Sequence, residues 1–165
     1  MVEVLKAKTK SDFIKIESLA DTIWRAHYIP IVGKPQIDYM LDKFQSVNAI
    51  EKQVIDGFEY FILNHSNIPV GYIAIRPEVE TLFLSKIYVL SHYRGQGIGK
   101  LAMDFVKQKA KTYDLDKIRL TVNINNTNSI KAYEKLGFKN IGPLVTEIGN
   151  GFVMDDYEMV KLVKS

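Results

Sequence analysis

The sequence predicts a mixed α/β fold in which a central, mostly antiparallel sheet is flanked by helices. Apolar residues recur every three or four positions in the first third of the chain and again after position 98, as in helices packed on one face. Runs rich in β-branched and aromatic residues, bounded by glycine, asparagine or proline, are typical of strands. Helices come first, followed by a hairpin, two strand–helix units and a final hairpin. This order describes a mixed sheet.

The front of the chain is expected to form a short strand and then a long helix. Residues 2–7 alternate as in a strand, and Ser11 and Asp12 are candidate caps for the helix. The helix should stop by Pro30, because proline lacks the backbone donor that a helix interior requires. Its apolar face is Ile16, Leu19, Ala20, Ile23 and Trp24.

The remaining elements follow from periodicity and from turn residues. We expect, in order, helices over 33–44 and 46–56, strands over 58–64, 68–76 and 82–89, a helix from 98 to about 113, a strand over 117–122, a helix from 126 or 127 to 137, and strands over 138–148 and 152–163. The turns His65-Ser66-Asn67 and Gly149-Asn150-Gly151 should close the two hairpins.

Composition excludes several classes of function. A chain of 165 residues suits one domain with a sizeable core, so residues 1–165 are expected to form a single domain. A net charge of +3 without a basic block gives no reason to expect a nucleic-acid partner. The lack of cysteine excludes disulfides, thiolate metal sites and a cysteine acyl-enzyme. His27, His65 and His92 show no ligand spacing, so no metal site is expected.

The sequence shows no pattern typical of a membrane-spanning segment or an export signal. No apolar run is long enough to span a bilayer, and the N-terminus lacks the shape of a signal peptide. We therefore expect a cytoplasmic protein without a membrane partner.

Residues 82–106 combine a strand, a glycine-rich turn and the start of a helix. The turn reads Arg94-Gly95-Gln96-Gly97-Ile98-Gly99-Lys100, with glycines at alternate positions. Glycines allow backbone N–H groups to point into one concavity, and a helix N-terminus adds partial positive charge. Arg94 supplies a full charge at the rim. The segment is therefore predicted to hold a phosphate group.

The spacing distinguishes among phosphate-binding loops. A Walker A loop requires glycine where Arg94 stands and serine or threonine where Leu101 stands. A dinucleotide fingerprint is met nominally by Gly97, Gly99 and Ala102, but the next strand leads into asparagines rather than an acidic residue. A third pattern, Arg or Gln, two residues, Gly, one residue and Gly or Ala, is met in full by Arg94, Gly97 and Gly99.

This third pattern, preceded by a strand ending Ile87-Tyr88-Val89, resembles the acetyl-CoA loop of the Gcn5-related N-acetyltransferases, the GNAT family. Residues 126–138 resemble that family's later motif, which has an Asn, a small residue three positions on, a Tyr four further on and a closing Gly-Phe. The two motifs stand in the family's order and separation and cover roughly the second half of the chain.

The resemblance implies the GNAT fold with acetyl-CoA as co-substrate, admitted where strands 82–89 and 117–122 splay apart. An unpaired strand edge can pair with the amides of pantetheine, and a backbone N–H there can meet the oxyanion of the tetrahedral intermediate. The residues that the resemblance assigns to the cofactor are Ile87, Tyr88, Val89, Arg94, Gly95, Gln96, Gly97, Ile98, Gly99, Lys100, Asn126, Ser129, Tyr133 and Lys135.

The resemblance also implies direct attack of a primary amine on acetyl-CoA in a ternary complex, with Tyr133 as general acid for the leaving thiolate. A primary amine has a pKa near ~10.4, so a base must remove a proton before attack. Many relatives carry glutamate where this chain has Ser85, and a serine hydroxyl cannot be that base. Glu78 and Glu80 are the candidate bases, and the pair Asp155-Asp156 is the other option.

The acceptor is expected to be a small amine, and the protein a monomer or homodimer. Trp24, the His27-Tyr28 pair and the closing Met154-Asp155-Asp156-Tyr157 resemble small-molecule acetyltransferases of the polyamine type. Three alternatives stay open: a non-catalytic acyl-CoA-binding or sensing module, an N-terminal protein or peptide acetyltransferase, and a dinucleotide-binding oxidoreductase fragment.

Overall fold

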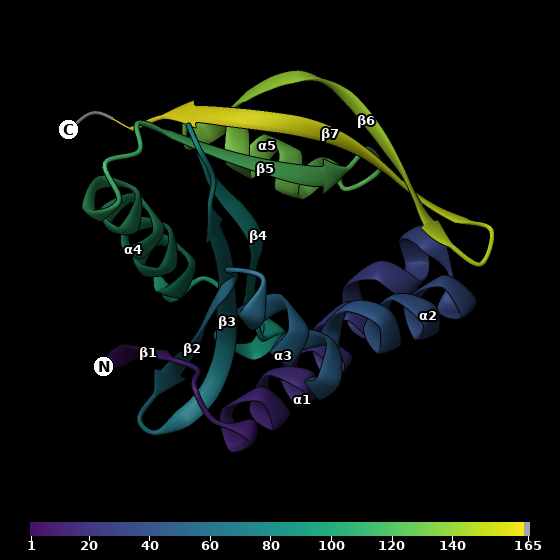
Figure 1. The fold of residues 1–165 in the computed structure, drawn as a ribbon, viewed down its shortest axis with the longest axis horizontal. Coiled ribbons are helices and arrows are strands. Elements are labelled where there is room, and N and C mark those ends of the chain that lie inside the picture. The colour runs from purple at the N-terminus through teal and green to yellow at the C-terminus, as the bar shows by residue number, and fades with distance from the viewer. Residues whose placement is uncertain (164–165) are drawn as a thin grey trace. The chain divides into compact units, whose positions relative to one another are not determined.

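The structure of the chain, a computed structural model, describes residues 1–163 and contains two compact units (Figure 1). The first unit comprises residues 1–76 and 86–106, and the second comprises residues 77–85 and the chain from Lys107 onward. The strand order is β1-β2-β3-β4-β5-β7-β6, and β4 contributes residues to both units. Antiparallel pairs predominate and β4 and β5 are parallel, so the predicted mixed, mostly antiparallel sheet is confirmed.

The predicted elements are all present, most of them within one or two residues of the expected bounds, and a 3₁₀ turn at Ser91–Tyr93 is added. The elements are β1 (Val2–Lys6), α1 (Lys10–Val32), α2 (Lys34–Gln45), α3 (Val47–Ile55), β2 (Glu59–His65), β3 (Ile68–Pro77), β4 (Leu82–Val89), α4 (Ile98–Thr112), β5 (Lys117–Asn123), α5 (Thr127–Lys135), β6 (Lys139–Gly149) and β7 (Phe152–Leu162).

In the first unit, helices cover both faces of β2 and β3. α1, α2 and α3 pack on the face that carries Tyr60 and Tyr72. On the other face, Phe61 packs edge-on against Phe105 of α4, with 4.8 Å between ring centroids. Because side chains alternate along a strand, the two strands are apolar on both faces. Burial of each large apolar side chain contributes roughly 1.5–3 kcal/mol, so these strands form the centre of the unit's core.

The N-terminus of α1 differs from the expectation that Ser11 and Asp12 cap it. Thr9 occupies the cap position, and its hydroxyl accepts the backbone N–H of Asp12 at 3.2 Å. The carboxylate of Asp12 in turn accepts the backbone N–H of Thr9 at 3.1 Å. This is a reciprocal capping box, in which each side chain satisfies a backbone donor that the helix leaves free.

α1 also continues through Pro30, where the sequence predicts its end. Proline removes one backbone donor, but little of the helix follows it before Gly33, whose N–H donates to the carbonyl of Ile29 at 2.9 Å. Tyr28, Ile29 and Val32 pack against the core cluster. Burial of this last turn therefore outweighs the missing hydrogen bond.

The second unit is built on β5, β7 and β6. β7 pairs antiparallel with both β5 and β6, and Leu82 and Phe83 of β4 pair parallel with β5. Ile118, Leu120 and Val122 are the buried residues of β5, alternating as predicted for a strand. The splaying of β4 away from β5 beyond Phe83 stays a prediction.

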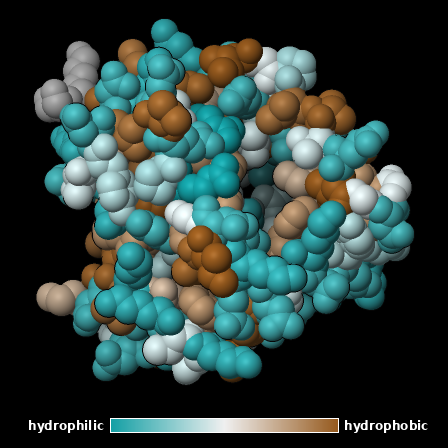
Figure 2. Space-filling model, viewed as in Figure 1, coloured by the Kyte–Doolittle hydropathy of each residue, from teal (hydrophilic) through white to brown (hydrophobic). Residues whose placement is uncertain are grey.

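Polar and apolar side chains are interspersed on the molecular face drawn in Figure 2. Exposed apolar side chains such as Ile141 and Val145 of β6 are common on folded proteins. Within residues 1–163, no helix combines the length and apolar character needed to cross a membrane.

Beneath α1–α3, a buried hydrogen-bond network joins the helices to the strands. The Tyr72 hydroxyl donates to Gln45 Oε1 at 2.6 Å, and Gln45 Nε2 donates to the Tyr60 hydroxyl at 3.0 Å. The Tyr60 hydroxyl donates to Gln53 Oε1 at 2.5 Å. Burial raises the pKa of both phenols, so each stays neutral and available as a donor.

Gln45→Met keeps the length of the side chain but removes both of its contacts to the buried phenols. The free energy of unfolding should fall by about 2–3 kcal/mol, because a buried polar group without a partner costs about 1–3 kcal/mol. Urea unfolding measures this loss. Gln108→Met, at an exposed position of α4, is the matched control and should change stability by no more than about 0.5 kcal/mol. Equal effects of the two substitutions would contradict a structural role for Gln45.

Candidate functional site

The glycine-rich loop lies in the first unit, between β4 and the first turn of α4. Gly95 and Gly97 have φ values of 78° and 80°, a region that residues with a side chain rarely adopt. Ile98 is buried at 2% exposure and anchors the start of the helix. The loop therefore needs glycine at these two positions for its backbone path.

Two side chains of the loop bond back to the chain that precedes it. Arg94 Nε donates to the carbonyl of Val89 at 3.2 Å, and Gln96 Nε2 donates to the carbonyl of His92 at 3.3 Å. The first contact joins the start of the loop to the end of β4, and the second joins the loop to the 3₁₀ turn. Arg94 is exposed, and its place at the rim of a phosphate site stays a prediction.

Gly99, in the first turn of α4, has open space beside it. A Cβ placed on Gly99 would meet no atom within 4 Å. The first backbone N–H groups of a helix have no partner within it and carry partial positive charge, which suits an anion. Lys100 is exposed and pairs with Asp104 at 3.6 Å along the helix. The geometry of the loop is thus compatible with a diphosphate.

The backbone of β4 presents alternate residues to opposite edges. The N–H of Leu90 donates to the carbonyl of Val70 in β3 at 2.7 Å, and the carbonyl of Tyr88 points at Gly71 of β3. Because the backbone groups of successive strand residues alternate in direction, those of Ile87 and Val89 face away from β3. This is the edge that the resemblance assigns to pantetheine.

An aromatic cluster that the sequence only partly indicated lies between α1 and β4. The hydroxyls of Tyr28 and Tyr88 are 2.9 Å apart, and both rings pack edge-on against Trp24, with centroids at 5.9 and 6.0 Å. The ammonium of Lys86 lies 5.9 Å from the Trp24 ring. Tyr28 follows Trp24 by one helical turn, and Lys86 and Tyr88 share one face of β4. This spacing was the signal in the sequence from which the two halves of the aromatic cluster could have been predicted.

The second motif lies in the second unit. Asn126 is buried at 5% exposure, and its N–H donates to the carbonyl of Asn123 at the end of β5. Tyr133 is half-buried and packs edge-on against Phe138, with ring centroids 5.6 Å apart. Ser129 is half-buried, whereas Lys135 is exposed. The predicted cofactor residues thus fall into two sets, one in each unit, and their joint contact with a ligand stays a prediction.

The two candidate bases differ in their surroundings. Glu78 forms a bidentate ion pair with Arg119, at 2.7 Å to Nε and 2.9 Å to Nη2. The same guanidinium packs on the ring of Phe83 at 4.2 Å and lies 3.5 Å from Glu158. The hydrogen bonds that Arg119 donates to Glu78 raise the pKa of Arg119 despite its partial burial. Glu80, by contrast, is exposed.

Asp156, one of the other options for the base, lies at the end of β5 where the second motif begins. It pairs in register with Asn123, and its side chain is buried at 6% exposure. Asp155 is half-buried, and its carbonyl accepts the N–H of Ile124. The buried carboxylate of Asp156 therefore lies beside the end of β5, three residues before the buried Asn126.

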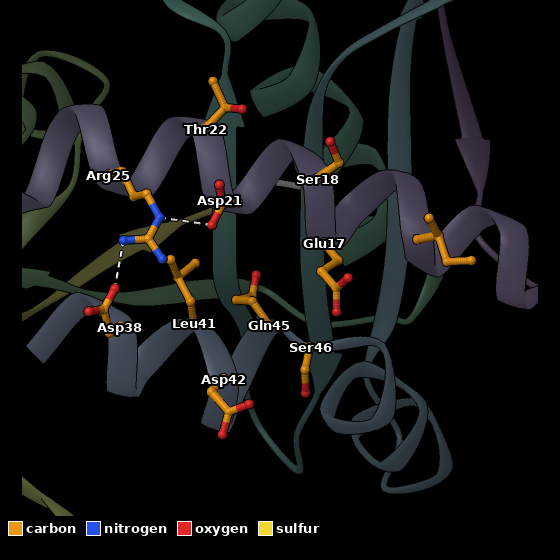
Figure 3. A pocket seen from close by; sticks show the side chains of 11 residues that line it. Glu17, Ser18, Asp21, Thr22, Arg25, Asp38, Leu41, Asp42, Gln45 and Ser46 are labelled. Carbon is orange, nitrogen blue, oxygen red and sulfur yellow. Dashed lines mark hydrogen bonds and ion pairs between the residues drawn. The ribbon is translucent and has the colours of Figure 1, made fainter. Parts of the chain in front are cut away.

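An open hollow of about 460 Å³ lies between α1 and α2 in the first unit (Figure 3). Asp21 and Asp38 in its lining both bind Arg25, at 2.9 and 2.6 Å. The carboxylate of Glu17 accepts the backbone N–H of Val47 at 2.8 Å and so caps α3. Over the described part of the chain, no group of three or more possible ligand side chains could hold a metal ion.

Comparisons with known proteins agree with both motifs. The model of the acetyltransferase (GNAT) family matches residues 16–138. The structure of the PaiA N-acetyltransferase of Thermoplasma acidophilum in complex with coenzyme A matches with a TM-score of 0.82 at 19% identity, covering 98% of this chain and 99% of that one. At this identity the match concerns the fold.

Two curated relatives match shorter segments. A protein of Bacillus subtilis subsp. natto named "probable spermine N(1)-acetyltransferase" is 30% identical over 38% of this chain and 42% of its own length. An N-alpha-acetyltransferase of Saccharolobus solfataricus is 31% identical over 52% of this chain and 59% of its own length. The chain spans about half the length of the curated relatives it matches. Since the family model covers most of the sequence, including the glycine-rich loop and the second motif, the chain belongs to the GNAT family of acetyltransferases.

Proposed function

We propose that the protein transfers the acetyl group of acetyl-CoA to a small primary amine by direct attack in a ternary complex. The observation that carries this proposal is the continuity of β4 with the loop. Ile87 and Val89 offer backbone groups to one edge, and the glycines with positive φ lead directly into the N-terminus of α4. Backbone donors at both places suit a ligand that carries amides at one end and a diphosphate at the other.

The reaction proceeds through one tetrahedral intermediate. A base takes a proton from the ammonium group, the neutral nitrogen then bonds to the acetyl carbon and loses a second proton to solvent, and the carbonyl oxygen takes negative charge. A backbone N–H of β4 stabilises this oxyanion. Collapse breaks the carbon–sulfur bond, and the thiolate takes a proton from the hydroxyl of Tyr133. A phenol has a pKa of ~10 and a thiol a pKa of ~8.5, so proton transfer from the phenol to the thiolate is unfavourable by about 2 kcal/mol. We therefore expect the transfer to be concerted with cleavage of the carbon–sulfur bond.

Tyr133→Phe tests the role of the hydroxyl. The turnover number should fall about 100-fold, because the thiolate then leaves without a proton donor, while the dissociation constant for CoA should stay within about threefold. Release of free thiol measures turnover, and calorimetry measures binding. Tyr113→Phe, at the end of α4, is the control and should leave both unchanged. A Tyr133→Phe variant with full turnover would exclude this hydroxyl as the acid.

For the base, we propose Glu80 or Asp156 and assign Glu78 a structural role. A carboxylate held by a bidentate guanidinium is stabilised in its ionised form and is therefore a poor proton acceptor. Glu80→Gln and Asp156→Asn separate the two, because the variant that lacks the base should lose the acidic limb of the pH–rate profile.

Glu78→Gln should lower the free energy of unfolding by about 1–3 kcal/mol, because it removes a charge-assisted contact from the half-buried Arg119. Its turnover number at saturating substrate should match that of the wild type. Glu80→Gln, at an exposed position two residues later in the same turn, should change the free energy of unfolding by no more than about 0.5 kcal/mol. Thermal denaturation at pH 7 measures both. Loss of turnover with unchanged stability in Glu78→Gln would reverse the assignment.

The loop is tested by binding alone. Gly97→Ala forces a side chain into a left-handed backbone conformation, and Gly142→Ala in β6 does the same at a φ of 130°; neither Cβ would meet an atom within 4 Å. Both should cost about 1 kcal/mol of stability. Only Gly97→Ala should weaken CoA binding, by about tenfold or more, because it re-aims the N–H groups of the loop. Equal CoA affinities would remove the loop from the proposed site.

The acceptor class is the finer part of the proposal. The relatives named for spermine and for N-terminal acetylation favour two different acceptors, a polyamine and a peptide. The carboxylates around the hollow of the first unit, such as Asp42, favour a cationic small molecule. A panel of polyamines, amino sugars and N-terminal peptides with acetyl-CoA separates these. Binding of acetyl-CoA without release of free CoA for any amine would instead support a sensing module. A cytoplasmic location and a monomer or homodimer complete the proposal.

A further inference from the structure

Gly71 of β3 has no room for a side chain, although its backbone conformation does not require glycine. Its φ lies outside the left-handed region, so other residues could adopt its backbone. A Cβ placed there would lie 2.2 Å from the carbonyl oxygen of Tyr88, 3.1 Å from the Cα of Val89 and 3.1 Å from a methyl carbon of Leu63. Two of these three nearest atoms belong to the backbone of β4, which cannot move away as a side chain can.

The backbone of β3 is irregular at the same place. Leu63 pairs with Gly71 and Asn64 pairs with Pro69, so Val70 is an extra residue on the β3 side. Such a bulge bends a strand and changes the direction of its backbone groups. The carbonyl of the bulged Val70 accepts the N–H of Leu90 at 2.7 Å. β3 thus holds β4 on both sides of Val89.

We propose that Gly71 is a positioning residue that sets the place of Tyr88 and Val89, and through them the backbone groups that the proposed function uses for pantetheine and the oxyanion. Val89 is fixed between two neighbours. The bare Cα of Gly71 lies on one edge of β4, and the guanidinium of Arg94 bonds the Val89 carbonyl on the other at 3.2 Å. Any side chain at position 71 therefore displaces the strand toward the cofactor edge.

The displacement of the Tyr88 carbonyl that a side chain at position 71 would cause is large enough to slow catalysis. Real Cβ atoms essentially never come within 3.0 Å of such a neighbour, so the Tyr88 oxygen must retreat from 2.2 Å to at least that distance. A misplacement of about 1 Å in a catalytic group costs roughly 100-fold in rate. The loop at Gly95 to Gly99 lies beyond the 3₁₀ turn and is anchored separately by Ile98, so it should keep its geometry.

Gly71→Ala should therefore separate turnover from CoA binding. We expect the turnover number to fall at least tenfold, a larger factor than the rise in the dissociation constant for CoA, because the strand that contacts pantetheine and the oxyanion moves while the diphosphate loop keeps its geometry. The amide NMR shifts of Ile87 and Val89 should change, and those of Gly95 and Gly99 should not. Ile73→Ala, a cavity in the same strand, is the control. It should lower the melting temperature without altering turnover or these shifts.

A second variant distinguishes backbone from side-chain crowding and guards against misfolding. Leu63→Val removes the one side-chain atom among the three nearest to the added Cβ, so Gly71→Ala with Leu63→Val is the better-accommodated chain. It should stay impaired, because the Tyr88 carbonyl still blocks the Cβ. Restored turnover in this double variant would overturn the proposal.

Unchanged NMR shifts of Ile87 and Val89 in Gly71→Ala would also overturn it, whether or not the wild type transfers acetyl groups. A wild type without turnover on any amine would count against the proposed function alone.

Discussion

The orientation of the backbone in β4 is the constraint on which the proposed site depends. A strand has only two edges, and β3 uses one of them through the carbonyl of Val70 and the close approach of Gly71. The groups of Ile87 and Val89 are thereby directed to the other edge. The same strand then runs through a short 3₁₀ turn into the loop, so the two proposed sets of backbone donors follow each other along the chain.

The rest of the first unit supports that strand from the helical side. Tyr88 stands on β4 between the backbone groups and the α1–α3 layer, and its hydroxyl bonds Tyr28 near the end of α1. The continuation of α1 through Pro30 is part of this support, because the burial of Tyr28 and Ile29 belongs to the same helical turn. The Gln45 network beneath gives the layer fixed hydrogen-bond partners, which an apolar core alone would lack.

Local patterns predicted the elements and both motifs, because periodicity and glycine spacing are written in neighbouring residues. The wrong cap of α1 is a local error, since Thr9 lies two residues before Ser11, but other features that were wrong or missed depend on contacts far apart in the sequence. Pro30 stays helical because of burial against other helices, and Glu78 is held by Arg119 on β5, 41 positions later. The meeting of Tyr28 with Tyr88 spans 60 positions. Spacing within a segment carries no information about such pairs, although each partner was visible as a single residue.

The division between backbone and side chains explains which part of the function resists prediction. The proposed donors for a diphosphate and for amides belong to the backbone, so glycine spacing and strand pattern are enough to predict where they lie. The acceptor and its base depend on side chains. Ser85 stands where the resemblance leads us to expect a glutamate, and the ion pair with Arg119 is the reason for the structural role that we propose for Glu78. In the proposed reaction, proton removal then falls to a carboxylate outside β4, Glu80 or Asp156. The base that serves this chain is therefore set by tertiary structure around the amine, and substrate class and base have to be determined together.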